Sequence, residues 1–190
     1  IKNLGNDFKW DVWGGGVIDL KYNQLIFSTA NAKPSWASDN RLGPNLFYNS
    51  VVSVDLETGK YKWHFQEIEH DLWNLDLAAP PMLVDIDQMD YVVQATKTGQ
   101  LILLNRKNGE PTEQVIEKKF DLYDDNEETF TVKKYFPNWL TYSRNNFTKD
   151  DINNLNKKFS SEAKKKISES IIGDTLPLDE NKNYIYYGIH

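Results

Sequence analysis

Residues 51–63 read VVSVDLETGKYKW, and this stretch decides the fold class. Its first part is an apolar run that favours a β-strand, and its middle contains the Asp, Thr and Gly of a tight turn. A second strand then ends at Trp63. The pattern predicts a β-hairpin within an antiparallel sheet.

The same pattern returns about fifty residues later, since residues 104–109 (LNRKNG) resemble residues 54–59 (VDLETG). Strand–turn units that recur every 40–50 residues or so are the signature of propeller blades. The sequence therefore predicts an all-β fold with the repeat of a β-propeller. Other short strands, separated by turn residues, are expected at residues 17–20, 25–29, 82–86, 91–95 and 101–105.

The second half of the chain is expected to interrupt this repeat. The acidic run at residues 121–128 is expected to be a solvated loop. Residues 148–172 are helical in character, with a capping box at Thr148 and Asp151 and a stop at Gly173. We expect one or two surface helices inserted between blades. Their apolar stripe, at spacings of three and four, consists of Ile152, Leu155, Phe159, Ala163, Ile167 and Ile171.

The two ends of the sequence predict that the chain is an internal fragment of a larger protein. The first residue is Ile1 and not Met, and Tyr184–His190 reads as a strand that stops midway. We expect partial blades over residues 1–120 and the acidic loop with the inserted helical segment over residues 121–175. The start of a further blade is expected over residues 176–190.

The composition excludes several classes of function. The 190 residues carry a net charge of −6, which argues against a nucleic-acid partner bound through its phosphates. The absence of Cys excludes disulfides, thiolate metal sites and Cys nucleophiles within the chain. No apolar run is long enough to span a membrane.

The polar stretch that follows the hairpin contains the first candidates for chemistry. Residues 63–77 read WHFQEIEHDLWNLDL. In this stretch Asp71 is either a catalytic group or a turn former. His70 could orient Asp71 or make a structural hydrogen bond, and the alternation of His64 with strand residues favours a packed histidine.

Three other residues have both a structural and a functional interpretation. Asn31, in a loop rich in Asn, Gly and Pro, could form an Asx turn or supply an oxygen ligand to a hard cation. Trp13 could belong to the core, or form a flat platform that Gly14–Gly16 lets a planar ligand approach. Lys97, in a tight turn, could be a solvated charge or the cation that stabilises an oxyanion.

Taken together, five ordered motifs resemble the quinoprotein dehydrogenases that use pyrroloquinoline quinone (PQQ). The motif at residues 94–100 and the inserted segment at residues 136–172 are similar to the membrane-bound branch that oxidises glucose, quinate and polyols. The motifs are Trp13–Gly16, Ser28–Trp36, Asp55–Trp63, His70–Trp73 with Asp76, Leu77 and Pro80, and Gln94–Gln100.

This resemblance implies an eight-bladed β-propeller with the quinone on its axis, of which the chain would hold about two to three blades. Asp71 falls on the family's general base and Asn31 on a ligand of the Ca²⁺ (or Mg²⁺) ion, next to the cofactor. Trp13 falls on the tryptophan that stacks under the quinone, with Trp10 as a near competitor. Lys97 falls on the cation beside the reactive carbonyls.

The resemblance also implies a function. The protein would oxidise a sugar, polyol or cyclic hydroxy acid of the glucose or quinate type by hydride transfer to PQQ. Its electrons would pass to a membrane quinone or a cytochrome in the respiratory chain. The expected location is the periplasm, with attachment to the inner membrane through a segment outside this sequence.

Two other readings stay open at this point. A non-catalytic propeller scaffold would need the blade repeat, but it would not need His70–Trp73, Asn31 and Lys97 together. A soluble PQQ-dependent alcohol dehydrogenase would share the chemistry. The sequence Thr96–Gln100 and the inserted helix argue against this last class.

Overall fold

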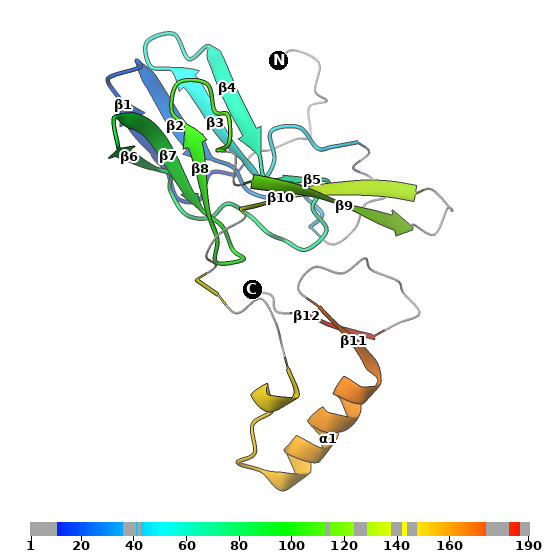
Figure 1. Cartoon of the computed structure of the whole chain (residues 1–190). Coiled ribbons are helices and arrows are strands. Elements are labelled where there is room, and N and C mark those ends of the chain that lie inside the picture. The colour runs from blue at the N-terminus through cyan, green and yellow to red at the C-terminus, as the bar shows by residue number, and fades with distance from the viewer. Residues whose placement is uncertain are drawn as a thin grey trace.

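A computed structural model describes most of the chain. The residues that it describes are 11–35, 41, 43–112, 115–123, 129–137, 142–143, 148–173 and 183–186. Figure 1 shows two neighbouring sheets, β1–β4 and β6–β8, with the long β9–β10 pair beside them and α1 at the far end.

The first sheet is the hairpin unit expected from the sequence. It contains β1 (Gly16–Asp19), β2 (Gln24–Ser28), β3 (Ser50–Asp55) and β4 (Tyr61–Gln66), in that order and antiparallel throughout. Both faces of β3 are buried over its first four residues, which explains why its sequence is a continuous apolar run with small serines rather than an alternating one. A four-stranded antiparallel meander is the form of a propeller blade.

The second sheet follows the same plan with three strands. Its strands are β6 (Met82–Ile86), β7 (Met89–Ala95) and β8 (Leu101–Asn105), again antiparallel and in chain order. These bounds confirm the strands expected at residues 82–86, 91–95 and 101–105.

The internal repeat is confirmed by matching hydrogen bonds in the two turns. The Gly59 amide donates to the carbonyl of Asp55 at 2.9 Å, and the Gly109 amide donates to the carbonyl of Asn105 at 2.8 Å. Both glycines have a positive φ, 66° and 74°, a conformation that side chains other than Gly rarely adopt. The turn glycine of the repeated pattern is therefore required by the backbone in both copies.

One apolar core is shared by the two sheets. Trp63 lies against Gly109 of the second sheet, and its indole Nε1 donates to Gln24 at 3.2 Å. The buried cluster consists of Ile26, Val51, Trp63, Phe65, Leu77, Val92, Ile102 and Leu104. Members of this cluster come from β2, β3, β4, β7 and β8, so the packing holds neighbouring blades together as well as filling each one.

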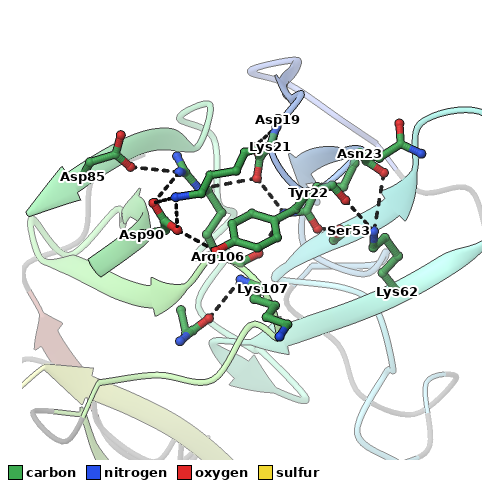
Figure 2. Close-up of polar contacts among 12 residues, drawn as sticks. Asp19, Lys21, Tyr22, Asn23, Ser53, Lys62, Asp85, Asp90, Arg106 and Lys107 are labelled. Carbon is green, nitrogen blue, oxygen red and sulfur yellow. Dashed lines mark hydrogen bonds and ion pairs between the residues drawn. The ribbon is translucent and has the colours of Figure 1, made fainter. Parts of the chain in front are cut away.

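A polar network joins the two sheets at one end, and Figure 2 shows its members around Arg106. The Arg106 guanidinium lies 2.8 Å from both Asp85 and Asp90 and 3.4 Å from Asp19. The Lys21 ammonium also pairs with Asp90, at 2.6 Å. Asp19 and Lys21 belong to the first sheet and its turn, so these ion pairs connect the first sheet to the second.

The strand pair at residues 115–137 was not expected from the sequence. β9 (Val115–Tyr123) pairs with β10 (Thr129–Pro137), and β10 pairs with the short β5 (Ile68–Glu69). The interpretation of residues 121–128 as a loop is therefore wrong for residues 121–123, which continue β9, while residues 124–128 lie outside the described residues. Thr, Val, Tyr and Phe in 129–137 are good strand formers and were the available signal.

The helical segment is shorter than expected. A 3-10 turn, η1 (Lys149–Asp151), precedes α1 (Lys157–Ser168), and the chain then forms β11 (Ser170–Gly173), which is parallel to β12 (Asn183–Tyr186). Asn156 caps α1 with its side-chain oxygen, since it accepts from the amides of Lys158 and Phe159 at 3.0 and 3.3 Å.

The helical character expected over residues 148–172 therefore extends too far at both ends, although one α-helix and one 3-10 turn do form within it. Asp151 does reach back to Thr148, at 2.8 Å from its amide, but this bond caps only the 3-10 turn. Asn153 accepts from the Leu155 amide at 2.8 Å and competes with a continuous helix. The expected apolar stripe is only partly buried, because Ile152 and Ile167 are buried while Leu155 and Phe159 are exposed.

Candidate functional site

The candidate residues gather at the end of the sheets opposite the Arg106 network. Because neighbouring strands are antiparallel, the start of β1, the end of β2 and the end of β4 lie at one end of the first sheet. Trp13 precedes β1, Asn31 follows β2, and Asp71 follows β4 and β5. In the second sheet the turn after β7 carries Lys97 to the same end, as its bond to Asp76 demonstrates.

Trp13 lies at the open side of this site. Its side chain is 61% exposed, and the Lys97 ammonium lies 5.8 Å from the ring centroid. The exposed ring therefore offers area for a flat ligand, with the Lys97 cation already over the ring. Trp10, the alternative platform, lies outside the described residues.

The glycines after Trp13 were expected to let a planar ligand approach, but two of them make close contacts with the protein's own backbone. A Cβ on Gly14 would lie 2.5 Å from the Pro80 nitrogen and 2.8 Å from the Ala78 carbonyl oxygen. A Cβ on Gly16 would lie 2.8 Å from the Ile26 carbonyl oxygen. Gly14 and Gly16 therefore let the chain pack against its own backbone, and the hypothesis that they admit a ligand is wrong for these two positions.

Asn31 is buried with an unsatisfied side chain. The residue is 2% exposed, and its backbone amide donates to Asp76 Oδ1 at 2.7 Å. Neither the oxygen nor the nitrogen of its side-chain amide has a hydrogen-bonding partner among the described residues. A buried amide without a partner costs about 1–3 kcal/mol, so such a group calls for a partner beyond the described residues.

Asp71 is buried, at 1% exposure, and held by three donors. The backbone amides of Trp73 and Leu75 donate to Oδ1 at 2.8 Å and to Oδ2 at 2.7 Å. The side chain of Asn49 donates to Oδ2 at 3.0 Å. Two of the three bonds fall on Oδ2, so Oδ1 keeps a lone pair that no described group uses.

The environment of Asp71 raises its affinity for a proton. Burial raises the pKa of the Asp71 carboxyl above its ordinary value, and the negative charge of Asp76 acts in the same direction. The hydrogen bonds from Trp73, Leu75 and Asn49 oppose this rise in pKa because they stabilise the carboxylate. A carboxylate with a raised pKa is a better proton acceptor than an exposed Asp.

Lys97 is fixed by two oxygen acceptors. Its ammonium donates to Asp76 Oδ2 at 2.6 Å and to the Asn74 carbonyl at 2.8 Å. The side chain is 14% exposed. An ammonium has three N–H donors, so one donor of Lys97 is available for a further oxygen.

Three residues of this site had no assigned role at the level of sequence. Asp76 bridges Asn31 and Lys97, Asn49 supports Asp71, and Arg41 donates to the Asp71 carbonyl at 2.7 Å. Asp76 lies five residues after Asp71 in the same polar stretch, which was the one available signal. Asn49 and Arg41 lie in the long loop before β3, where the sequence gives no sign of their partners.

His70 and His64, the two described histidines, both make structural contacts. His70 Nδ1 is bonded to the Gly43 carbonyl at 2.7 Å, which fits the structural alternative rather than the orientation of Asp71. His64 packs edge-on against Phe47 and bonds to the Tyr61 hydroxyl at 2.8 Å, as expected for a packed histidine.

The described part of the chain contains no group of three or more His, Asp or Glu side chains that could hold a metal by itself. None of the described helices is long and apolar enough to cross a membrane.

A comparison with protein families decides what this site belongs to. The family model described as "PQQ: Glucose/ethanol/alcohol dehydrogenase, beta-propeller domain" matches residues 5–189. The chain belongs to this family. The match confirms the β-propeller fold and the resemblance to the quinoprotein dehydrogenases.

Curated relatives of the family include both alcohol and sugar enzymes. The chain is 34% identical over 113 residues to the quinohemoprotein alcohol dehydrogenase of Comamonas testosteroni, covering 53% of this chain and 16% of the relative. It is 32% identical over 114 residues to quinoprotein glucose dehydrogenase A of Acinetobacter calcoaceticus, covering 57% and 14%. It is 33% identical over 118 residues to the quinate/shikimate dehydrogenase (quinone) of Acinetobacter baylyi, covering 59% and 15%. The chain thus spans only 14–16% of the length of these quinoproteins.

A solved quinoprotein structure is also similar. The quinohemoprotein alcohol dehydrogenase from Comamonas testosteroni aligns with 62% of this chain and 21% of its own, at 28% sequence identity and a TM-score of 0.46.

Proposed function

We propose that the protein to which this chain belongs is a PQQ-dependent dehydrogenase that oxidises a CH–OH group. The observation that carries the proposal is the buried side-chain amide of Asn31, which has no partner among the described residues. The backbone amide of the same residue is connected through Asp76 to Lys97, at the end of the sheets where Asp71 lies. The blade repeat of a scaffold does not by itself account for a buried polar group without a described partner at this end of the sheets.

The residues present fit the two groups that the family implies. The side-chain oxygen of Asn31 is a hard ligand suited to Ca²⁺ or Mg²⁺, and it is buried without a hydrogen-bonding partner in the described part of the chain. The exposed ring of Trp13 and the spare donor of Lys97 suit a planar cofactor that carries carbonyl oxygens. When bound, PQQ supplies an electron-poor carbonyl carbon that accepts a hydride, and the metal ion polarises that carbonyl.

In this proposal the chain itself contributes a base, a cation and a platform. Asp71 takes the proton of the substrate hydroxyl on Oδ1, the oxygen with the unused lone pair. Lys97 donates its third N–H to oxygen that gains negative charge during the reaction. Trp13 holds the plane of the cofactor, and the burial of Asp71 excludes the water that would weaken these interactions.

For the substrate we propose a sugar, polyol or cyclic hydroxy acid. The motif at residues 94–100 supports this choice, as do the glucose and quinate enzymes among the relatives. An alcohol is the second candidate, because the identity to an alcohol dehydrogenase is as high as that to the sugar enzymes.

The remaining assignments are part of the same proposal. A membrane quinone or a cytochrome would accept the electrons, and the protein would work in the periplasm at the inner membrane. Within residues 1–120, the sheets β1–β4 and β6–β8 would form the blades that carry the site. The insertion between blades would follow the β9–β10 pair and run to residue 175, and residues 176–190 would begin the next blade.

The proposal is tested by reconstituting the complete protein with PQQ and Ca²⁺ and measuring dye reduction. The panel contains glucose, other aldoses, polyols, quinate and simple alcohols. PQQ-dependent turnover with any of them supports the class, and the best substrate decides between the two candidates. A protein that binds no PQQ and turns over none of them would overturn the proposal and favour a scaffold.

A further inference from the structure

The carboxylate of Asp76 links the two halves of the candidate site. Asp76 is fully buried, in the segment between β5 and β6. One of its oxygens, Oδ1, accepts a hydrogen bond from the backbone amide of Asn31 at 2.7 Å. The other, Oδ2, accepts a hydrogen bond from the Lys97 ammonium at 2.6 Å. A single side chain therefore fixes a loop of the first sheet and a turn of the second sheet.

The same contacts restrict the direction of the Lys97 ammonium. With Asp76 and the Asn74 carbonyl on two of its N–H groups, only the third can point elsewhere. A flexible lysine side chain loses this restriction when one acceptor is removed, because its charge then moves toward solvent. Asn74 alone is a neutral acceptor and cannot replace the charge of the carboxylate.

We propose that Asp76 is a positioning residue for the cofactor site. It holds the Lys97 donor and the Asn31 loop at a fixed separation, so that both groups can act on one ligand. This inference rests on the proposed function, since the ligand in question is PQQ with its metal ion. Asp76 acts through Lys97 and Asn31 and is given no contact with substrate.

An amide at this position cannot make both contacts. In Asp76→Asn one oxygen is replaced by NH₂, which is a donor and has no lone pair for either the Asn31 amide or the Lys97 ammonium. Since both partners are donors, one of them loses its acceptor. The pair is also buried, so the Lys97 charge would be left without its counter-charge.

The test measures PQQ binding to the complete apoprotein in the presence of Ca²⁺, by fluorescence quenching. We compare wild type, Asp76→Asn, Lys97→Ala and the double variant. The matched control is Asp90→Asn, which breaks an ion pair of Arg106 and Lys21 at the opposite end of the sheets. Thermal unfolding is followed for every variant.

We expect Asp76→Asn to weaken PQQ binding about 10- to 100-fold, as for other residues that orient a direct ligand. In the Lys97→Ala background the same substitution should cost no more than about threefold, because the two side chains act as one unit. Asp90→Asn should leave PQQ affinity unchanged while lowering the melting temperature. Asp76→Glu, which keeps the charge, should bind PQQ more tightly than Asp76→Asn.

Unchanged PQQ affinity in Asp76→Asn would overturn the inference, as would an equal loss in the presence and absence of Lys97. If Asp76→Asn does not fold, the PQQ affinity of Asp76→Glu becomes the deciding measurement. A wild-type PQQ affinity in Asp76→Glu would contradict a positioning role, because the longer side chain places the carboxylate differently. A wild-type protein that binds no PQQ would overturn the proposed function and this inference with it. If the wild-type protein binds PQQ and the Asp76 variants bind it equally tightly, this inference alone is overturned.

Discussion

The indole ring of Trp63 lies directly against the α-carbon of Gly109, in the turn of the neighbouring sheet. The position that a Cβ of residue 109 would take is already occupied by ring atoms of Trp63. The two residues belong to successive copies of the repeat, which explains how a blade can recognise the next one. Gly109 therefore serves its own turn and also gives Trp63 of the preceding copy a surface to pack against, whereas the Cβ position of Gly59 is open.

This contact predicts that Gly109→Ala destabilises the protein more than Gly59→Ala. Both glycines have a positive φ, so both substitutions strain the backbone by about 1 kcal/mol. Only at Gly109 does the new methyl group collide with Trp63, which adds about 1–3 kcal/mol of overpacking. Urea unfolding measures both variants, and equal losses would show that the Trp63 contact carries no energy.

Arg106 is predicted to be the main polar link between the sheets. Arg106→Ala leaves the buried carboxylate of Asp19 without its cation, so we expect a loss of about 3–5 kcal/mol in the free energy of unfolding. The matched control is Lys107→Ala, since Lys107 is the exposed neighbour in the same turn, and it should change stability by less than about 0.5 kcal/mol. Figure 2 shows both side chains. A similar small effect at Arg106 would contradict this view of the network.

The β9–β10 pair is anchored to the site by a buried ion pair. Lys134 of β10 lies 3.1 Å from Glu67, both side chains are almost fully buried, and burial raises the pKa of the Glu67 carboxyl. We expect Glu67→Met or Lys134→Met alone to cost about 3–5 kcal/mol, because each removes the ion-pair partner of a buried charge. The double variant should recover most of this loss. If chemical denaturation shows that the double variant loses as much free energy of unfolding as the two single variants together, the ion pair is not the source of the effect.

The pH dependence of turnover should report the environment of Asp71. The base must be ionised, so kcat/KM should fall as the pH drops through the pKa of Asp71, which burial raises above its ordinary value. Removing a hydrogen bond to the carboxylate raises its pKa further, and Asn49→Ala should therefore shift the acidic limb to higher pH. A limb that stays in place in Asn49→Ala would count against Asp71 as the titrating group.

The extent to which the sequence predicted this molecule depends on the range of the interactions. The repeat around Asp55 and Asn105 could be read because its turn chemistry is local and nearly identical in both copies. Asp71 and Lys97 could be selected because short motifs surround them. Gly14 was misinterpreted because its neighbours, Ala78 and Pro80, lie more than sixty residues away in the sequence.

The supporting residues could not be predicted for the same reason. Asn49 and Arg41 contact Asp71 across 22 and 30 residues, and neither contact leaves a pattern in the sequence. Helical structure was expected over the whole of residues 148–172 because apolar residues recur there at spacings of three and four. The side chains of Asn153 and Asn156, which bond to backbone amides nearby, interrupt the helical segment between η1 and α1.

The central claim is that Asp71 removes a proton from a substrate whose hydride reduces bound PQQ. The most direct measurement is a single-turnover experiment on the complete protein loaded with PQQ and Ca²⁺, in wild type and in Asp71→Asn. The cofactor spectrum is followed after rapid mixing with the best substrate. We predict equal PQQ binding in both proteins and a reduction rate about 10²- to 10⁴-fold lower in Asp71→Asn. Reduction at the wild-type rate in Asp71→Asn would contradict the claim.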